Sequence, residues 1–154
     1  MAQRTVINSL AGATLSISAS LPATYDAAGY AATTIAYTAV GEVENFGSHG
    51  VTASVTEFTP VDTSVVAKVK GSKNYGTMSL TIGDIPGNAG QVIMRAASES
   101  NAHYSVKITY QDTSVHYMDV LVSKYEQQDG SVNDVIKIGC DLAICRIPVI
   151  VAQS

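Results

Sequence analysis

Residues 103–125 read HYSVKITYQDTSVHYMDVLVSKY, and polar and apolar residues alternate strictly through the first eight of them. This period of two is typical of a β-strand that has one buried face and one polar face. The turn residues QDT separate this run from a second one, which predicts a β-hairpin. One register keeps both apolar sets on one face, with these opposed pairs: Tyr110 with Ser114, Val106 with Met118, Tyr104 with Val120 and, on the polar face, Ser105 with Asp119. We therefore expect an antiparallel sheet that contains this hairpin.

Three further segments alternate in the same way: ATLSISAS (13–20), VTASVTEF (51–58) and GTMSLTIG (76–83). We expect their apolar residues to face a core, namely Ala13, Leu15, Ile17, Ala19, Val51, Ala53, Val55, Met78, Leu80 and Ile82. The polar positions are mostly Ser and Thr. Because hydroxyl groups find hydrogen-bond partners easily, such a face can stay hydrated or pack against a neighbour.

The C-terminal segment DVIKIGCDLAICRIPVIVA (134–152) is the longest apolar stretch of the chain. Alternation places five residues on one face: Ile136, Ile138, Cys140, Leu142 and Ile144. Pro148 cannot donate to a strand ladder, so we expect a bulge, an edge or a new strand there. Cys140 and Cys145 would lie about 16 Å apart in one extended strand, which is too far for a disulfide. Free thiols are therefore expected.

One segment, DIPGNAGQVIMRAASES (84–100), predicts a helix from about residue 88 to 99. Asn88 is suited to cap its N-terminus. The apolar stripe expected to face the sheet consists of Ala89, Val92, Ile93, Ala96 and Ala97. Residues 21–33 and 45–50 lack clean periodicity and predict irregular connectors.

The stretch KVKGSKNYGTM (68–78) carries three of the nine basic residues. A phosphate-binding P-loop would need a lysine directly after its second glycine, whereas Thr77 follows Gly76, and a strand-like run follows instead of a helix. Nucleotide binding is therefore not expected. The flanking alternation predicts a hairpin whose tip is Gly71–Gly76, with glycines available for positive φ.

Composition favours one domain over residues 1–154, since a chain of this size can bury a core of its own. Charged residues make up only 14%, against about 25% in typical domains. Such a bland surface suits a protein covered by copies of itself or by partners. The net charge of −4 disfavours a nucleic-acid grip, and no apolar run is long enough for a membrane-spanning helix, so no membrane anchor is expected.

Candidate catalytic residues do not assemble into a site. The natural suspects are His49, His103 and His116; on the register above, His103 and His116 lie on opposite faces and do not converge. Glu42 and Glu44 share a strand face, which favours a hydrated or channel-lining wall over paired-carboxylate catalysis. No nucleophile elbow or dinucleotide fingerprint is present. We expect no enzymatic activity, no catalytic or cofactor-binding residue, no cofactor and no metal site.

The order of the expected elements, together with specific segments, resembles the major tail tube proteins of long-tailed bacteriophages. The segments that carry the resemblance are GATLSIS (12–18), PATYDAAGY (22–30), AVGEVENFG (39–47), TEFTPVDTSVVAKVKGSKNYGTMSL (56–80), DIPGNAGQ (84–91) and DVIKIGCDLAICRIPVIV (134–151). They span nearly the whole chain, although no single motif is diagnostic.

This resemblance implies a mainly β fold: an antiparallel β-sandwich or half-barrel with one flanking α-helix, related to the tube subunit of type VI secretion. It further implies homohexameric rings that stack into a hollow conduit, which encloses the tape-measure protein and passes the genome during ejection. DNA would pass through the lumen without specific binding. Further expected partners are tail terminator and tip proteins, in a virion tail assembled in the bacterial host cytoplasm. We expect no appended immunoglobulin-like domain, and therefore no surface decoration by this subunit.

Seven residues are predicted to contact neighbouring subunits: Phe46, Lys68, Lys70, Lys73, Asn74, Tyr75 and Arg146. Lysines on a projecting hairpin of an acidic subunit fit a contact with another copy better than a contact with a nucleotide. The alternative is a soluble β-sandwich binding module of the carbohydrate-binding or adhesin type. Such a module would need exposed aromatic residues on one sheet face, and the absence of Trp weakens it.

Overall fold

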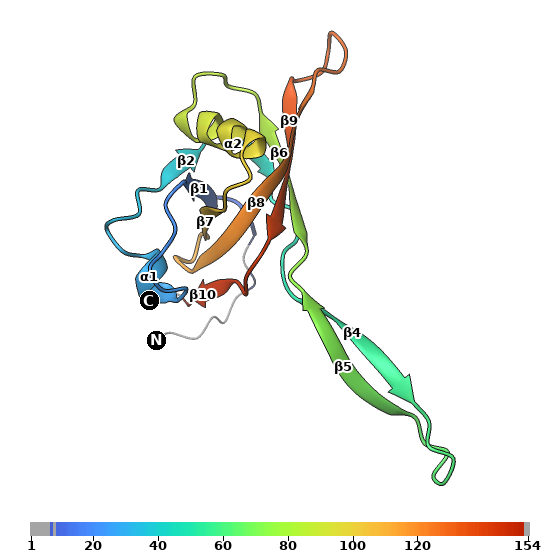
Figure 1. Cartoon of the computed structure of the whole chain (residues 1–154). Coiled ribbons are helices and arrows are strands. Elements are labelled where there is room, and N and C mark those ends of the chain that lie inside the picture. The colour runs from blue at the N-terminus through green and yellow to red at the C-terminus, as the bar shows by residue number, and fades with distance from the viewer. Residues whose placement is uncertain (1–6, 8, 153–154) are drawn as a thin grey trace.

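The computed structural model describes residues 7 and 9–152. Within this part of the chain the elements are β1 (Thr14–Ser18), α1 (Ala27–Tyr30), β2 (Thr38–Val40), β3 (Val43–Asn45), β4 (Thr52–Phe58), β5 (Ala67–Asn74), β6 (Thr77–Gly83), α2 (Ala89–Glu99), β7 (Tyr104–Thr109), β8 (Val115–Gln128), β9 (Lys137–Ile144) and β10 (Val149–Val151). The mainly β character expected from the sequence is confirmed (Figure 1).

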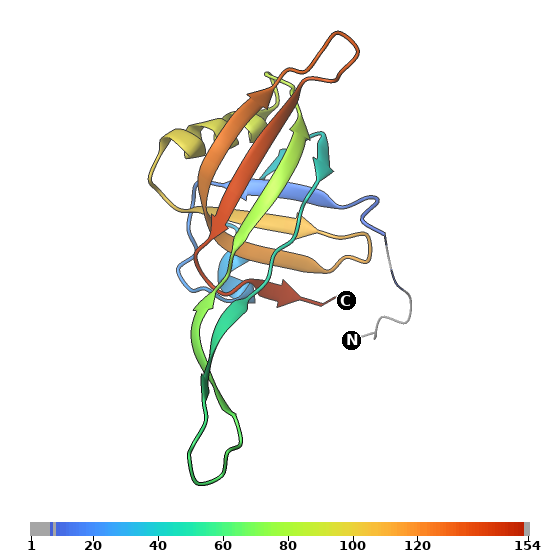
Figure 2. The same ribbon diagram turned by 90° about the vertical axis from the view of Figure 1, so that its right-hand side faces the viewer.

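A single antiparallel sheet with the order β2-β1-β7-β8-β9-β6-β3 forms the body, and β10 pairs with β8. The long strand β8 joins its two halves, because β7 pairs with Val115–Val120 whereas β9 pairs with Val120–Gln128. A register shift between Val122 and Lys124 lies in the second half of β8. Figure 2 shows β1 and β7 crossing the direction of β6 and β9, so the sheet folds over on itself as a half-barrel.

The hairpin of β7 and β8 has the register that the sequence predicts. Tyr104 pairs with Val120, Val106 with Met118 and Ser105 with Asp119. The turn closes with a hydrogen bond from the Tyr110 amide to the Ser114 carbonyl at 2.9 Å. Period-two alternation therefore located both strands and their pairing.

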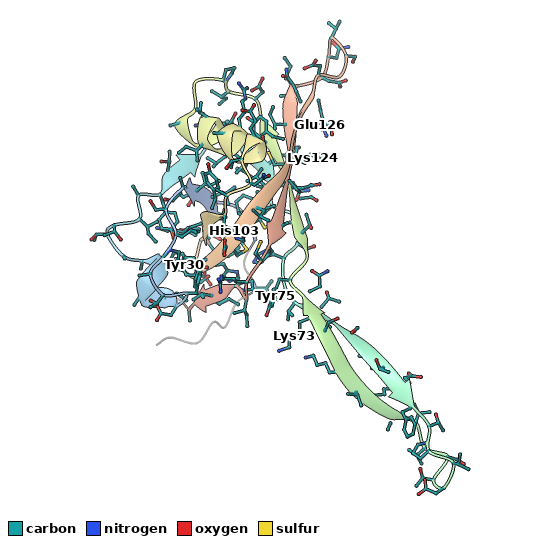
Figure 3. The ribbon with its side chains drawn as sticks, in the orientation of Figure 1. Tyr30, Lys73, Tyr75, His103, Lys124 and Glu126 are labelled. Atoms are coloured by element: carbon teal, nitrogen blue, oxygen red, sulfur yellow. The ribbon has the colours of Figure 1, made fainter. Side chains whose placement is uncertain are left out.

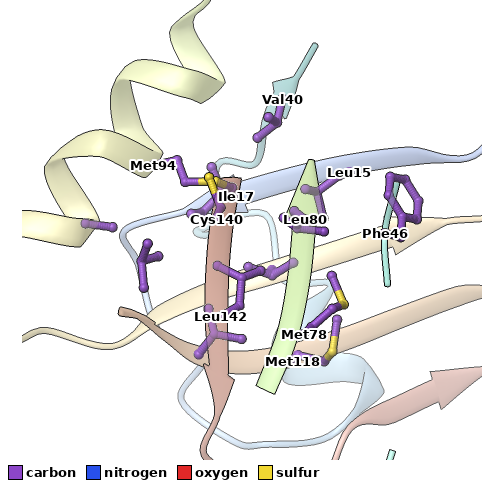
Figure 4. Close-up of a cluster of buried hydrophobic side chains, with 14 of the residues drawn as sticks. Leu15, Ile17, Val40, Phe46, Met78, Leu80, Met94, Met118, Cys140 and Leu142 are labelled. Carbon is purple, nitrogen blue, oxygen red and sulfur yellow. The ribbon is translucent and has the colours of Figure 1, made fainter. Parts of the chain in front are cut away.

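The core fills the space between the two halves of the sheet and α2 (Figure 4). Its buried side chains include Leu15, Ile17, Met78, Leu80, Ile82, Met94, Val106, Met118, Ile138, Cys140 and Leu142. The predicted core faces of β1, β6 and β9 are confirmed at these positions. Two outer residues differ, since Ala19 is exposed and Ile136 lies exposed before β9 begins.

Helix α2 is capped by Asn88 as predicted, with the Gln91 amide donating to Asn88 Oδ1 at 3.1 Å. The predicted buried stripe is wrong in part. The residues that face the body are Gly90, Gln91, Met94 and Ala97, whereas Ala89, Val92 and Ala96 are exposed. Gly90 explains the rotation, because a Cβ there would lie 2.2 Å from the Ala39 carbonyl oxygen. The helix therefore presses its glycine against the backbone of β2.

The polar face of the β7–β8 hairpin is partly covered by the connector that contains α1. Ser105 and Asp119 are buried, and the Ser105 hydroxyl donates to the Ser20 carbonyl at 2.8 Å. The Tyr30 ring stacks on Tyr117 with centroids 5.4 Å apart. Thus the Ser/Thr-rich face packs against a neighbouring segment of the same chain.

The hairpin predicted around Gly71–Gly76 is wrong. Strand β5 runs through Gly71 and pairs with β4, whereas β6 pairs with β9 and β3. Gly76, with φ of +78°, turns the chain out of β5 and into the main sheet. The tip of the β4–β5 hairpin is instead residues 59–66. The expected dry face of β4 is also wrong, since Val51 and Val55 are exposed.

The C-terminus follows the expectation for Pro148. Strand β9 ends at Ile144, and the Cys145 amide donates to the Asp119 carbonyl at 2.9 Å. After Pro148 a new strand, β10, pairs with residues 115–117 of β8. Both cysteines are free, as predicted.

Candidate assembly surface

Strands β4 and β5 pair only with each other and form an arm that projects from the body (Figures 1 and 2). Every residue of β5 is exposed, and so is nearly all of β4. A two-stranded hairpin alone is only marginally stable in water. The arm is therefore a candidate surface for covering by another molecule.

A register shift in the arm decides where its lysines point. Ala53 pairs with Lys73 and Val55 with Lys70, so two steps along β4 oppose three along β5. Residues three apart in a regular strand face opposite ways. The extra residue of this bulge offsets that difference, so Lys70 and Lys73 lie on the same face of the arm. Lys68 pairs with Glu57 and lies on the same face. This cationic face thus carries all three lysines of the arm.

The opposite face of the arm is uncharged. Ser54 and Ser72 lie there with their hydroxyl oxygens 3.4 Å apart. Further along, Phe58 and Val69 are 65% and 61% exposed. An exposed Phe and Val on a projecting strand pair are unusual for a free surface and typical of an interface.

The end of the body opposite the arm is acidic. It is held together by an ion pair between Lys137 and Glu44 at 2.8 Å and by a bond from the Gly83 amide to the Glu42 carbonyl at 2.8 Å. We call this the acidic end. Strand pairing and hydrogen bonds bring together its carboxylates, which are Glu42, Glu44, Asp84, Glu126, Asp129 and Asp134, with Lys124 and Lys137 as the lysines among them. Figure 3 shows Lys124 and Glu126 on this side of the body and Lys73 on the arm.

Local hydrogen bonds keep one of these carboxylates charged. The Ser131 amide and hydroxyl donate to Asp134 Oδ2 at 2.8 and 2.9 Å. Since both bonds favour the ionised form, they hold the pKa of Asp134 below its ordinary value, and nearby Lys137 acts in the same direction.

The other predicted contact residues lie in different settings. The Asn74 side chain accepts a bond from the Gly76 amide at 2.8 Å, and Tyr75 is half-buried against the core (Figure 3). Phe46 is buried in the core of its own chain, away from the surface. Arg146 donates to Asp119 at 3.2 Å and stacks over Tyr25 at 3.8 Å. The structure thus groups the lysines with Asn74 and Tyr75 and separates Phe46 and Arg146 from them.

Two features were not found from the sequence. The acidic end gathers residues from four separate segments, so only the topology brings them together. The second is a contact between His49 and His116, whose Nε2 and Nδ1 atoms lie 2.9 Å apart. His103 does lie on the other face, as predicted, with its Nδ1 atom 3.0 Å from Asp119.

Within residues 7 and 9–152, no group of three or more His, Cys, Asp or Glu residues is arranged to hold a metal ion. Among the helices of this described part, neither is long and apolar enough to cross a membrane.

Neither family models nor curated proteins match this sequence. Solved structures do. A chain of the anti-feeding prophage baseplate, determined with six-fold symmetry, aligns over 99% of this chain and 98% of its own, with a TM-score of 0.69 and 12% identity. A chain of the PVC extracellular contractile injection system, from its sheath/tube terminator, aligns over 96% and 98%, with a TM-score of 0.66 and 11% identity.

The SPP1 tail tube subunit aligns over 88% of this chain and 75% of its own, with a TM-score of 0.57 and 13% identity. The chain has the tail-tube fold. The expected fold class is thereby confirmed.

Proposed function

We propose that this chain is the structural subunit of a tail tube, in which six copies close a ring and rings stack into a hollow conduit. The observation that carries the proposal is the alignment of the tail-tube fold over nearly the whole chain, including a chain from a six-fold symmetric assembly. The chain acts by self-association, as a structural protein and not as an enzyme.

The surface of the single chain supports self-association. The order of the main sheet leaves β2 and β3 at its edges, with unpaired backbone groups available to a neighbour. Exposed edges tend to recruit other strands, and closing a ring removes them. The exposed apolar side chains of the arm need the same kind of cover.

Charge supports a head-to-tail direction for the stacking. The cationic face of the arm carries Lys68, Lys70 and Lys73, and the acidic end lies on the opposite side of the body. When identical subunits stack head to tail, the arm of one meets the far end of the next. Each exposed ion pair contributes only about 0.2–1 kcal/mol, but a ring repeats the contact in every subunit.

The conduit is proposed to enclose the tape-measure protein and to pass the genome without binding it, as in a long-tailed phage virion assembled in the host cytoplasm. Tail terminator and tip proteins would then cap its ends. The likeness to the SPP1 tail tube supports this version. A second candidate is the tube of a contractile injection system, which the nearly complete alignments with the prophage baseplate and PVC chains favour. Co-assembly with a sheath protein would distinguish the second candidate.

The experiment reverses charge on the arm. The variant K70E/K73E should remain folded by circular dichroism but lose tubes in negative-stain micrographs of concentrated protein. Adding E126K and D129K to the same chain should restore stacking, because both partners of the contact are then reversed. The control is Lys107→Glu, which changes a lysine of the body that lies over the Tyr37 ring. Wild-type tube formation by K70E/K73E would refute the contact.

A further inference from the structure

Two histidines meet where the arm joins the body. His49 lies in the connector between β3 and β4, and His116 lies on β8. Their rings are edge to face with centroids 5.2 Å apart, and His49 Nε2 is 2.9 Å from His116 Nδ1. This contact bridges 67 residues of sequence. It therefore attaches the connector to a distant strand of the main sheet and not to residues that are near it in sequence.

The arm is attached to the body through two short connections, residues 46–51 and 75–76. A cavity of about 250 Å³ lies between them, lined by residues 48–52 and 75–77. A Cβ on Gly50 or Gly76 would meet no atom within 4 Å. Few side-chain contacts are available at these glycines. The arm is held by the His49 contact, by the packing of Phe46 and Tyr75, and by a bond from the Ile144 amide to the Gly76 carbonyl at 3.0 Å.

The chemistry of the histidine pair, His49 and His116, makes the contact sensitive to acid. One imidazole must donate to the other, which needs a free lone pair on the acceptor. One additional proton leaves this bond intact, but a second removes the last acceptor and places two positive charges together. Burial lowers the pKa of His49 from its ordinary value, so the imidazole charges only in more acidic solution.

Aromatic and aliphatic side chains pack beside the pair. The Tyr110 ring packs against His116 with centroids 4.8 Å apart, and β7 and β10 place Ile108 and Ile150 beside it. Tyr75 shares the cavity wall with His49. Asp112 lies in the turn between β7 and β8, four residues before His116.

We propose that the histidine pair is an acid-released contact, which holds the arm against the body near neutral pH and frees its root in acid, once both imidazoles are charged. This goes beyond a role as tube subunit, because it makes the orientation of the arm a function of pH. Assembly that uses the arm would then be favoured at neutral pH and weakened in acid.

The test is hydrogen exchange followed by mass spectrometry on dilute, unassembled protein at pH 7.5 and pH 5, corrected for the intrinsic pH dependence of exchange. In the wild type, peptides covering residues 46–52 should exchange about fivefold faster at the lower pH, as the loss of one hydrogen bond implies. Peptides from β6 and β9 should not change. Because the sample is unassembled, the outcome does not depend on tube formation.

The variant H49Q/H116N keeps amide groups at the positions of the interacting nitrogens but cannot titrate, so its exchange should not depend on pH. The chain has only three histidines, and His103→Gln is the matched control that leaves the pair intact. An unchanged wild type, or the same pH response in H49Q/H116N, would overturn the proposal. If that variant fails to fold, imidazole NMR titration of the wild type decides: two coupled steps support the pair, and two independent, unshifted titrations refute it.

Discussion

Gln91 offers the sharpest test of how α2 is attached to the body. Its side chain is 2% exposed and makes three hydrogen bonds to backbone. Oε1 accepts from the Ile85 amide at 3.0 Å, and Nε2 donates to the Gly41 and Gly83 carbonyls at 3.1 and 2.9 Å. The substitution Gln91→Ala removes all three bonds and leaves their backbone partners in a partly buried site.

At about 1 kcal/mol for each bond, Gln91→Ala should lower the free energy of unfolding by about 3 kcal/mol. For a chain of this size the melting temperature should fall by about 6–12 °C. The assay is urea denaturation of unassembled protein, followed by circular dichroism and supported by calorimetry. Gln127→Ala is the control, because that side chain makes one exposed bond to Asp129, and it should cost less than about 0.5 kcal/mol. A loss at Gln91 no larger than at Gln127 would refute this attachment.

Two further predictions concern the backbone and the tyrosines. Gly47 has φ of +66°, and a Cβ there would lie 2.4 Å from the Ser79 carbonyl oxygen. Gly47→Ala should therefore lower the free energy of unfolding, measured by urea denaturation, by more than about 2 kcal/mol. Gly50→Ala is the control and should leave it nearly unchanged, because a Cβ at Gly50 would meet no atom within 4 Å. Burial raises the pKa of Tyr30 to about 12. The unfolded chain therefore releases this proton first, and stability should fall between about pH 10 and pH 12, with Tyr30→Phe reducing that slope. A titration followed by phenolate absorbance measures the raised pKa of Tyr30. Ionisation of every tyrosine near pH 10 while the chain stays folded would contradict this prediction.

Much of the fold could be predicted because alternation is a local signal. It located β1, β6, β7, β8 and β9 and paired Val106 with Met118. The helix ends were equally readable, since the Asn88 cap is a local side chain to backbone bond. These features need only residues that are close in sequence or directly opposed.

The failures share a physical cause, which is dependence on distant partners. The segment 65–83 looked like one hairpin because both of its halves alternate, but β5 pairs back to β4 and β6 pairs forward to β9. The expected helix stripe is wrong because Gly90 is buried against β2, and Gln91 is buried by its bonds to the loops at Gly41 and Ile85. The sequence pattern could not show that a glycine and a polar residue, Gly90 and Gln91, face the body.

The candidate assembly surface also combines features that the local sequence predicts with features that depend on distant partners. The lysines could be singled out from the sequence, but their common face depends on the bulge between Lys70 and Lys73. The acidic end and the contact between His49 and His116 required the folded topology. Arg146 was expected at a subunit contact, and its ion pair with Asp119 gives it a role within the chain. A subunit contact there stays a prediction.

Assembly into a tube is tested most directly by a three-dimensional cryo-EM reconstruction of the concentrated, purified protein. We expect hollow tubes of stacked six-fold rings in which the cationic face of each arm lies against the acidic end of a subunit in the next ring. Particles that stay monomeric at high concentration would contradict the tube. Tubes in which Lys70 and Lys73 face solvent would contradict the contact.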